Sequence, residues 1–281
     1  MYSPVDGEGD TAEKRERISA SIAAVPPSSN FTLEGLGYGF AGVRIGQNSP
    51  ITNHQFKIGE PLTVTIPSEQ KTKDTETYIL GLNNLADIGD LSNKYLKSFV
   101  IPSSNKLKRI ILGNDHRNYY NLYWGETKGS AVDVQSCYLL EEFNMINCDE
   151  YKESLNFSAC KQLRRLFLTN CGLSSLTLPE GTVIEELRLP NTIQTLDIKN
   201  QTFLNADKFT YGTFEYGEGQ DHMFNEDGSL TTGSKYINNY NSLRYISVIN
   251  TPIDSYDIAR KANLVEYRFT NVNWILDEQD E

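Results

Sequence analysis

The stretch Leu163–Leu168 reads LRRLFL, and the stretch Leu173–Leu178, ten residues further on, reads LSSLTL. Both follow the pattern apolar-x-x-apolar-x-apolar, which also occurs at Leu140–Met145 as LEEFNM. Apolar residues two positions apart point to the same side of a β-strand, so each stretch predicts a short strand with one buried face. We take the second apolar position, such as Leu166, as the marker of each predicted strand.

The markers recur at a nearly constant interval. From Phe99 to Leu196 the successive steps are 11, 12, 10, 11, 12, 11, 10, 11 and 9 residues. A coil of about 11 residues is too short to enclose a core, so two strands are expected to form one turn of about 22 residues, which is within the leucine-rich-repeat range. Each turn leaves an apolar edge that the next turn covers. The markers are Phe99, Ile110, Leu122, Val132, Phe143, Leu155, Leu166, Leu176, Leu187 and Leu196, a weaker one at Asp207, and then Ile246, Tyr256 and Tyr267.

The sequence therefore predicts a mainly β fold: a leucine-rich-repeat-like solenoid with half-turns of about 11 residues, preceded by a small β unit and a short helical cap. Residues 62–66 alternate as LTVTI, which is typical of a half-buried strand. Residues 78–93 have apolar positions three apart, which favours a helix. The predicted divisions are a flexible acidic segment at 1–30 with a short helix at 12–24, the β unit and cap at 31–94, the solenoid at 95–276 with an insertion at 212–241, and an acidic tail at 277–281.

Four cysteines test the repeat, because each lies five residues after a marker. Zinc would require closely spaced pairs supported by histidine, which are missing. Cysteines on stacked turns have Cα atoms close enough for a disulfide, but their Cα–Cβ vectors are parallel, which makes the geometry of the bond poor. The pattern favours a ladder of buried, reduced thiols. The four residues are Cys137, Cys148, Cys160 and Cys171.

The insertion at 212–241 contains five glycines, one of them in the dipeptide Asp227-Gly228, which predict a hairpin or an excursion loop. Its aromatic residues stand in an otherwise polar segment, and long insertions on a rigid scaffold often form binding surfaces. Asn225–Gly228 resembles a calcium loop but lacks the alternating acidic spacing. Exposed tyrosine side chains are typical of surfaces that bind other molecules. Tyrosine is also common in β-strands, so these residues can equally reflect strand formation alone. The candidate binding residues are Phe214, Tyr216, His222, Tyr236, Tyr240 and Tyr123; no catalytic or metal residue and no cofactor is predicted.

Composition argues against several classes of function. The 281 residues have a formal net charge of −11, which disfavours nucleic-acid binding, and no apolar run is long enough to span a membrane. Gly37-x-Gly39-x-x-Gly42 matches a dinucleotide fingerprint in letters, but no helical pattern follows it. The three histidines lie in separate segments, and no nucleophile motif accompanies them. An enzyme would need His222 and a nearby carboxylate in one pocket, and we predict that the chain is not an enzyme.

Residues Phe157–Leu168 and Leu187–Pro190 resemble leucine-rich repeats of the BspA-like kind. The segments 178–193, 196–201 and 250–254 are similar to repeat regions of virion and tail structural proteins of gut bacteriophages, and the likeness covers about residues 95–270 without the insertion. It implies a virion structural module that contacts other virion proteins or a host surface protein or glycan. The alternative is an adhesin on the bacterial cell surface, which would bind a glycan or protein through the tyrosine-rich insertion.

Overall fold

The computed structural model describes two groups of residues. The first comprises mainly strands, at 18–22, 30–35, 39–45, 50, 52–56, 62–65, 75–80, 85–89, 96–100 and 107–111. The second is nearly continuous, at 132–146, 148, 151–181, 184–220, 225 and 229–272.

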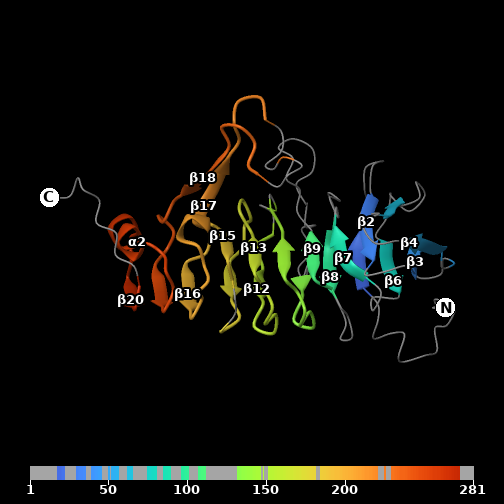
Figure 1. Ribbon diagram of the computed structural model, residues 1–281, viewed down its shortest axis with the longest axis horizontal. Coiled ribbons are helices and arrows are strands. Elements are labelled where there is room, and N and C mark those ends of the chain that lie inside the picture. The colour runs from blue at the N-terminus through green and yellow to red at the C-terminus, as the bar shows by residue number, and fades with distance from the viewer. Residues whose placement is uncertain are drawn as a thin grey trace.

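The chain forms an elongated, mainly β structure, with one α-helix among the described residues, in which a β-solenoid of about five turns makes up the C-terminal part (Figure 1). Nine strands form a continuous sheet, which we call the long sheet. In spatial order they are β18 (Lys235–Asn238), β17 (Phe209–Glu215), β15 (Glu186–Pro190), β13 (Arg165–Phe167), β11 (Glu142–Asn144), β9 (Arg109–Ile111), β7 (Leu85–Gly89), β2 (Asn30–Gly35) and β5 (Leu62–Thr65).

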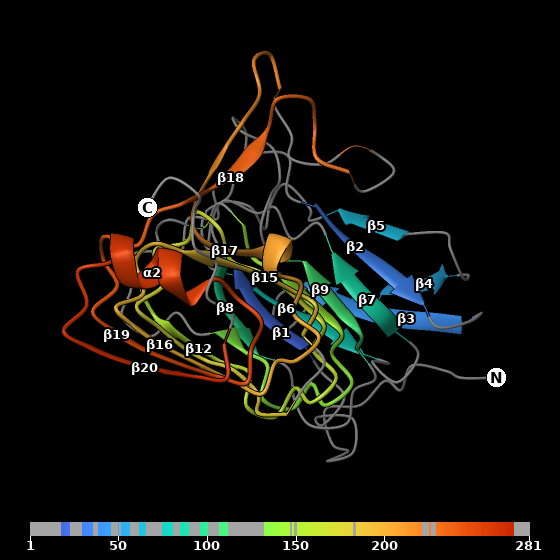
Figure 2. The same ribbon diagram turned by 60° about the vertical axis from the view of Figure 1, so that its left-hand side comes forward.

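The other face of the solenoid is made of three smaller sheets. The first has six strands, β10 (Val132–Asp133), β8 (Leu96–Val100), β1 (Ile18–Ile22), β6 (Thr75–Leu80), β3 (Gly39–Ile45) and β4 (Thr52–Phe56). The second pairs β12 (Ser154–Asn156) with β14 (Ser175–Thr177), and the third joins β16 (Thr195–Lys199), β19 (Tyr245–Ile249) and β20 (Glu266–Thr270). Figure 2 shows the two faces side by side, with the strands of successive turns stacked in each.

The parallel register shows how the turns stack. Phe143 pairs with Leu166, Leu166 with Leu187, and Leu187 with Phe209, which are intervals of 23, 21 and 22 residues. On the other face, Leu196 pairs with Ile246 across 50 residues, because the insertion lies between their strands. Each strand therefore contacts the strand one turn away, as a solenoid requires.

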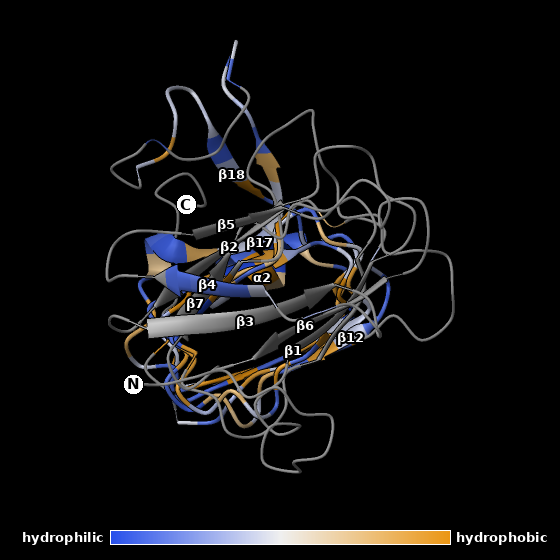
Figure 3. Cartoon of the chain, turned by 90° about the vertical axis from the view of Figure 1, so that its right-hand side faces the viewer, coloured by the Kyte–Doolittle hydropathy of each residue, from blue (hydrophilic) through white to orange (hydrophobic). Residues whose placement is uncertain are grey.

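One apolar core extends between the two faces. The described markers from Ile110 to Leu187 are buried, except Leu176, which is partly buried. The Phe143 and Phe157 rings from the two faces meet edge to face with centroids 5.0 Å apart. Figure 3 looks along the long axis and shows the turns lying one behind another. Because every turn contributes side chains to a core shared with its neighbours, no turn is an independent unit.

Asparagines end several strands with a left-handed residue. Asn200, Asn250 and Asn271 follow β16, β19 and β20 with φ angles of 57°, 51° and 51°. Asparagine adopts this conformation more easily than other non-glycine residues. The Nδ2 of Asn250 donates to Oδ1 of Asn200 at 2.7 Å, and the Nδ2 of Asn271 donates to Oδ1 of Asn250 at 2.8 Å. The side-chain amides thus link equivalent corners of consecutive turns.

The four cysteines are free thiols and all are buried, as the ladder predicts. The Sγ of Cys160 donates to the carbonyl oxygen of Val134 at 3.4 Å, and the Sγ of Cys171 donates to that of Met145. Donor and acceptor are 26 residues apart in both cases, so each thiol bonds to the preceding turn. Burial raises the pKa of the Cys160 thiol to about 12.

We predict that Cys160 makes the protein less stable at alkaline pH. Between its unfolded pKa of about 8.5 and its folded value, the unfolded chain loses the thiol proton while the folded chain keeps it, so the free energy of unfolding falls as pH rises. Urea unfolding at pH 8 and pH 10 should show a loss that is about 1–2 kcal/mol larger for the wild type than for Cys160→Ala. Equal losses in the two proteins would contradict this assignment.

The helices predicted in the N-terminal half are wrong. The structure has strand β1 within 12–24, and the end of β6 and all of β7 within 78–93, where a helical cap was expected. Pairing in a sheet outweighs the weak helical spacing of such short segments. Both faces also run across the predicted boundary between residues 94 and 95, because β7 pairs with β9 and β1 pairs with β8.

Two predicted strands of the solenoid are also wrong. At the Asp207 marker the structure has the 3₁₀-helix η3 (Ala206–Lys208), and at the Tyr256 marker it has α2 (Ser255–Lys261). Asp254 caps α2 by accepting a hydrogen bond from the backbone N–H of Asp257 at 3.0 Å, a local signal that favours a helix. The predictions for residues 1–17, for Leu122 and for the tail at 277–281 lie outside the described residues.

Candidate interaction surface

The insertion begins as a β-hairpin at the edge of the long sheet. The first half of β17 pairs in parallel with β15, and its second half pairs with β18, where Thr213 faces Ile237 and Phe214 faces Tyr236 in an antiparallel register. The hairpin rises from the body of the solenoid (Figure 2). The prediction of a hairpin is therefore confirmed for the two strands that form its base.

Apolar side chains fasten this hairpin to the outer side of the long sheet. Phe214 packs with Ile146 and Phe167, two side chains that point away from the main core, and Tyr216 and Tyr236 pack against the same group. The Phe214 ring lies 5.0 Å from each of the two tyrosine rings, edge to face. We call these five residues the outer aromatic cluster.

Arg188 lies beneath the outer aromatic cluster and is almost completely buried. Its guanidinium carbon is 4.2 Å from the centre of the Tyr236 ring, which is cation–π distance. Its Nε donates to Glu186 at 3.0 Å and its Nη1 donates to the Thr210 hydroxyl at 2.7 Å. Burial raises the pKa of Tyr236, and the nearby Arg188 charge opposes part of this shift. The buried charge is therefore satisfied by a carboxylate, a hydroxyl and an aromatic face.

The structure separates the predicted binding residues. Phe214 and Tyr216 lie with Tyr236 in the outer aromatic cluster, whereas Tyr240 is buried in the main core, where its ring stacks on that of Tyr211 at 5.8 Å. His222 and Tyr123 lie outside the described residues. Phe214 and Tyr240 are thus interior residues, and Tyr216 and Tyr236 are only half exposed.

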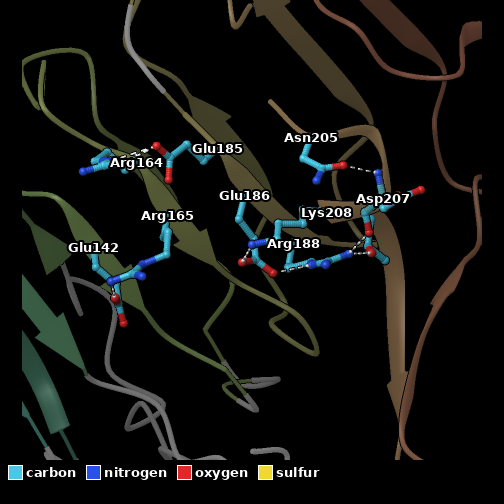
Figure 4. A network of polar contacts seen from close by, with 10 residues as sticks. Glu142, Arg164, Arg165, Glu185, Glu186, Arg188, Asn205, Asp207 and Lys208 are labelled. Carbon is cyan, nitrogen blue, oxygen red and sulfur yellow. Dashed lines mark hydrogen bonds and ion pairs between the residues drawn. The ribbon is translucent and has the colours of Figure 1, made fainter. Parts of the chain in front are cut away.

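Charged side chains occupy the two positions before the markers Ile110, Phe143, Leu166 and Leu187, and their sign alternates from one strand to the next. Figure 4 shows part of this arrangement, from Glu142 to Lys208. Glu142 Oε2 lies 2.5 Å from Arg165 Nη2, and Glu185 Oε1 lies 2.5 Å from Arg164 Nη2. The hydrogen bond to Glu185 raises the pKa of Arg164. We call the two rows the charge ladder: Arg109, Glu142, Arg165, Glu186 and Lys208 in one, and Lys108, Glu141, Arg164 and Glu185 in the other.

The apolar pattern does not predict the charge ladder, because Glu141-Glu142 and Glu185-Glu186 occupy the variable positions of that pattern and their neighbours in adjacent turns are not specified by it. In the structure they lie on or directly before β11 and β15, two inner strands of the long sheet, and form ion pairs with neighbouring turns. The available signal is the order of the dipeptides before the markers, which alternate from basic at 108–109 to acidic at 141–142, basic at 164–165 and acidic at 185–186. Opposite charges directly across a sheet are stabilising, so the ladder favours one stacking order of the turns.

We predict that Arg165→Glu destabilises the protein by about 1–2 kcal/mol, because it places a carboxylate between Glu142 and Glu186. Adding Glu142→Arg should restore part of the loss, and urea unfolding of the wild type, both single variants and the double variant measures this coupling. Lys161→Glu is a matched control, because Lys161 is exposed and outside the ladder. If the double variant loses as much stability as the two single variants together, the pairing of Arg165 with Glu142 is contradicted.

Other candidate chemistry finds little support in the described residues. Gly39 begins strand β3, so a strand rather than a helix N-terminus follows the glycine-rich motif. No group of three His, Cys, Asp or Glu residues is placed to hold a metal ion in the part of the chain that the structure describes. Of the helices described there, none has the length and apolar character to cross a bilayer.

The arrangement is thus a stack of turns held in order by a shared core and a charge ladder, with a hairpin fastened to its outer side. Comparisons with family models, with curated proteins and with solved structures find no match for this chain.

Proposed function

We propose that the chain is a non-enzymatic structural module of a virion or tail-associated protein, which mediates protein assembly or host contact. The observation that carries this proposal is the uninterrupted parallel stacking of β11, β13, β15 and β17 with one core shared along the stack. Such a scaffold is rigid along its length and presents repeated surfaces to other proteins. Intervals of 21–23 residues between paired strands support a leucine-rich-repeat-like type, with one half-turn on each face.

The side-chain chemistry supports a structural role. The charged groups of the ladder and Arg188 are paired with one another rather than left for a substrate. The adhesin alternative has less support, because it needs exposed aromatic rings on the insertion, whereas Phe214 and Tyr240 are buried. Its test is a glycan array and a protein pull-down with the wild type and Tyr216→Ala.

Mass spectrometry of purified particles tests the leading proposal. We expect peptides of this chain in gradient-purified virions produced from the genome that encodes it, at a stoichiometry constant between preparations. A non-structural protein expressed from the same genome serves as the control for contamination. Recovery of the chain only from the cell lysate, and never from particles, would overturn the proposal.

A further inference from the structure

A core position is exposed on β20, the outermost described strand of its sheet. Leu196, Ile246 and Tyr267 occupy the same register position on β16, β19 and β20. Their exposed fractions are 1%, 4% and 63%. The first two are covered by a following turn, and β20 is the last strand of its sheet among the residues that the structure describes. Tyr267 is therefore a core residue by position and a surface residue by exposure.

The edge of β20 also presents backbone groups that can pair. The N–H of Glu266 bonds to the carbonyl of Arg244, and the carbonyl of Thr270 accepts from Asn250, so these two residues face β19. Residues alternate in a parallel ladder, which turns the N–H and C=O of Tyr267 toward the open edge. Natural edge strands are usually protected by proline, a bulge or an inward-pointing charge. None of these occurs within Glu266–Thr270.

The sequence of this edge is complementary to itself. Glu266 and Arg268 flank Tyr267 with opposite charges, and neither forms an ion pair with another residue that the structure describes. If two copies pair antiparallel about Tyr267, Glu266 of each copy lies opposite Arg268 of the other. Val265, which is 69% exposed, then lies on the same side as Tyr267. Pairing about Arg268 would instead place the two guanidinium groups opposite each other, which is unfavourable.

We propose that β20 is a dimerisation edge at which two copies of this chain join by antiparallel strand pairing centred on Tyr267. The contact is symmetric, because the same strand serves both partners. It continues the sheet across the interface, covers both Tyr267 side chains and pairs Glu266 with Arg268 twice. The proposal rests on the assembly role proposed above and names the partner as a second copy.

Charge reversal tests this pairing directly. Sedimentation of the full chain between about 1 and 300 µM should show a reversible monomer–dimer equilibrium, the range expected for a small interface. Glu266→Arg or Arg268→Glu alone should weaken dimerisation roughly tenfold or more, because two attractive pairs become repulsive. An equimolar mixture of the two single variants should form heterodimers, and the double variant should regain the wild-type affinity.

Tyr267→Lys should also abolish dimerisation, since it places an inward-pointing charge at the edge. Tyr138→Lys is its matched control, because Tyr138 is 60% exposed and lies away from β20. Circular dichroism and thermal unfolding of each variant establish that it is folded. If Tyr267→Lys does not fold, the equimolar mixture of Glu266→Arg and Arg268→Glu still tests whether the two strands pair as proposed.

A chain that stays monomeric throughout this range would overturn the proposal, as would a dimer unaffected by the single reversals or an open-ended series of larger oligomers. These outcomes are separate from those of the particle experiment. A charge-dependent dimer whose chain is absent from virions contradicts the virion role and leaves the edge contact established. A virion protein without this dimer contradicts only the edge contact.

Discussion

Phe143→Ala is expected to lower the free energy of unfolding by about 3–5 kcal/mol, the range for removing a buried phenylalanine. The Phe143 side chain is fully buried on β11, faces Ile110 and Leu166 in the flanking turns, and meets the Phe157 ring from the opposite face. The cavity would therefore remove contacts from the turns on both sides. Urea unfolding measures the loss, and hydrogen exchange should show weaker protection in β9 and β13 as well as in β11.

Phe203→Ala is the matched control for this prediction. Phe203 is 65% exposed, so its removal should change stability by less than about 0.5 kcal/mol. If Phe143→Ala costs as little as Phe203→Ala, or if the exchange effect is confined to β11, the core is not shared between turns.

Gly212→Ala is expected to release the hairpin from the long sheet and to cost about 3–5 kcal/mol. A Cβ at Gly212 would lie 1.8 Å from the carbonyl oxygen of Ile237, so β17 and β18 cannot keep their pairing. Release of β18 would expose Phe214 and Phe167, each worth about 1.5–3 kcal/mol when buried. Urea unfolding measures the loss. Brief chymotrypsin digestion with mass spectrometry should show new cleavage after Phe214 and Tyr236.

Gly219→Ala separates this steric effect from a general cost of replacing glycine in the insertion. Gly219 has a φ of 73°, and no atom lies within 4 Å of an added Cβ, so only the strain of a left-handed residue applies, about 1–2 kcal/mol. Its cleavage pattern should match the wild type. Unchanged protection of Phe214 in Gly212→Ala would show that the hairpin base is not held as described.

Periodicity located most of the solenoid because each marker has to fill the same place in the core. Phe143, Leu155, Leu166, Leu176 and Leu187 all lie within strands, alternately on the two faces. The pattern failed at Tyr256, where Ile253 and Ile258 are buried in a turn that contains a helix. Burial requires apolar side chains at these positions but does not distinguish a strand from a short capped helix over so few residues.

The surface features were harder to predict than the core. From the sequence alone, the aromatic residues of the insertion are expected to be exposed and able to bind a partner. In the structure Phe214 packs against Phe167 and Ile146, which are distant in sequence, and is buried by them. The edge proposed for dimerisation could not be predicted for the same reason, because the sequence does not show that β20, which carries Glu266 and Arg268, is the outermost described strand of its sheet.

The sequence by itself determined the repeat, most of its strands and the buried thiols, because each depends on local alternation of apolar residues and on a nearly constant interval. Only the tertiary structure decided which charges form pairs, where the hairpin packs and which strand edge is left open. Those features depend on contacts between turns about 22 residues apart, and a linear pattern does not specify which neighbour each side chain meets.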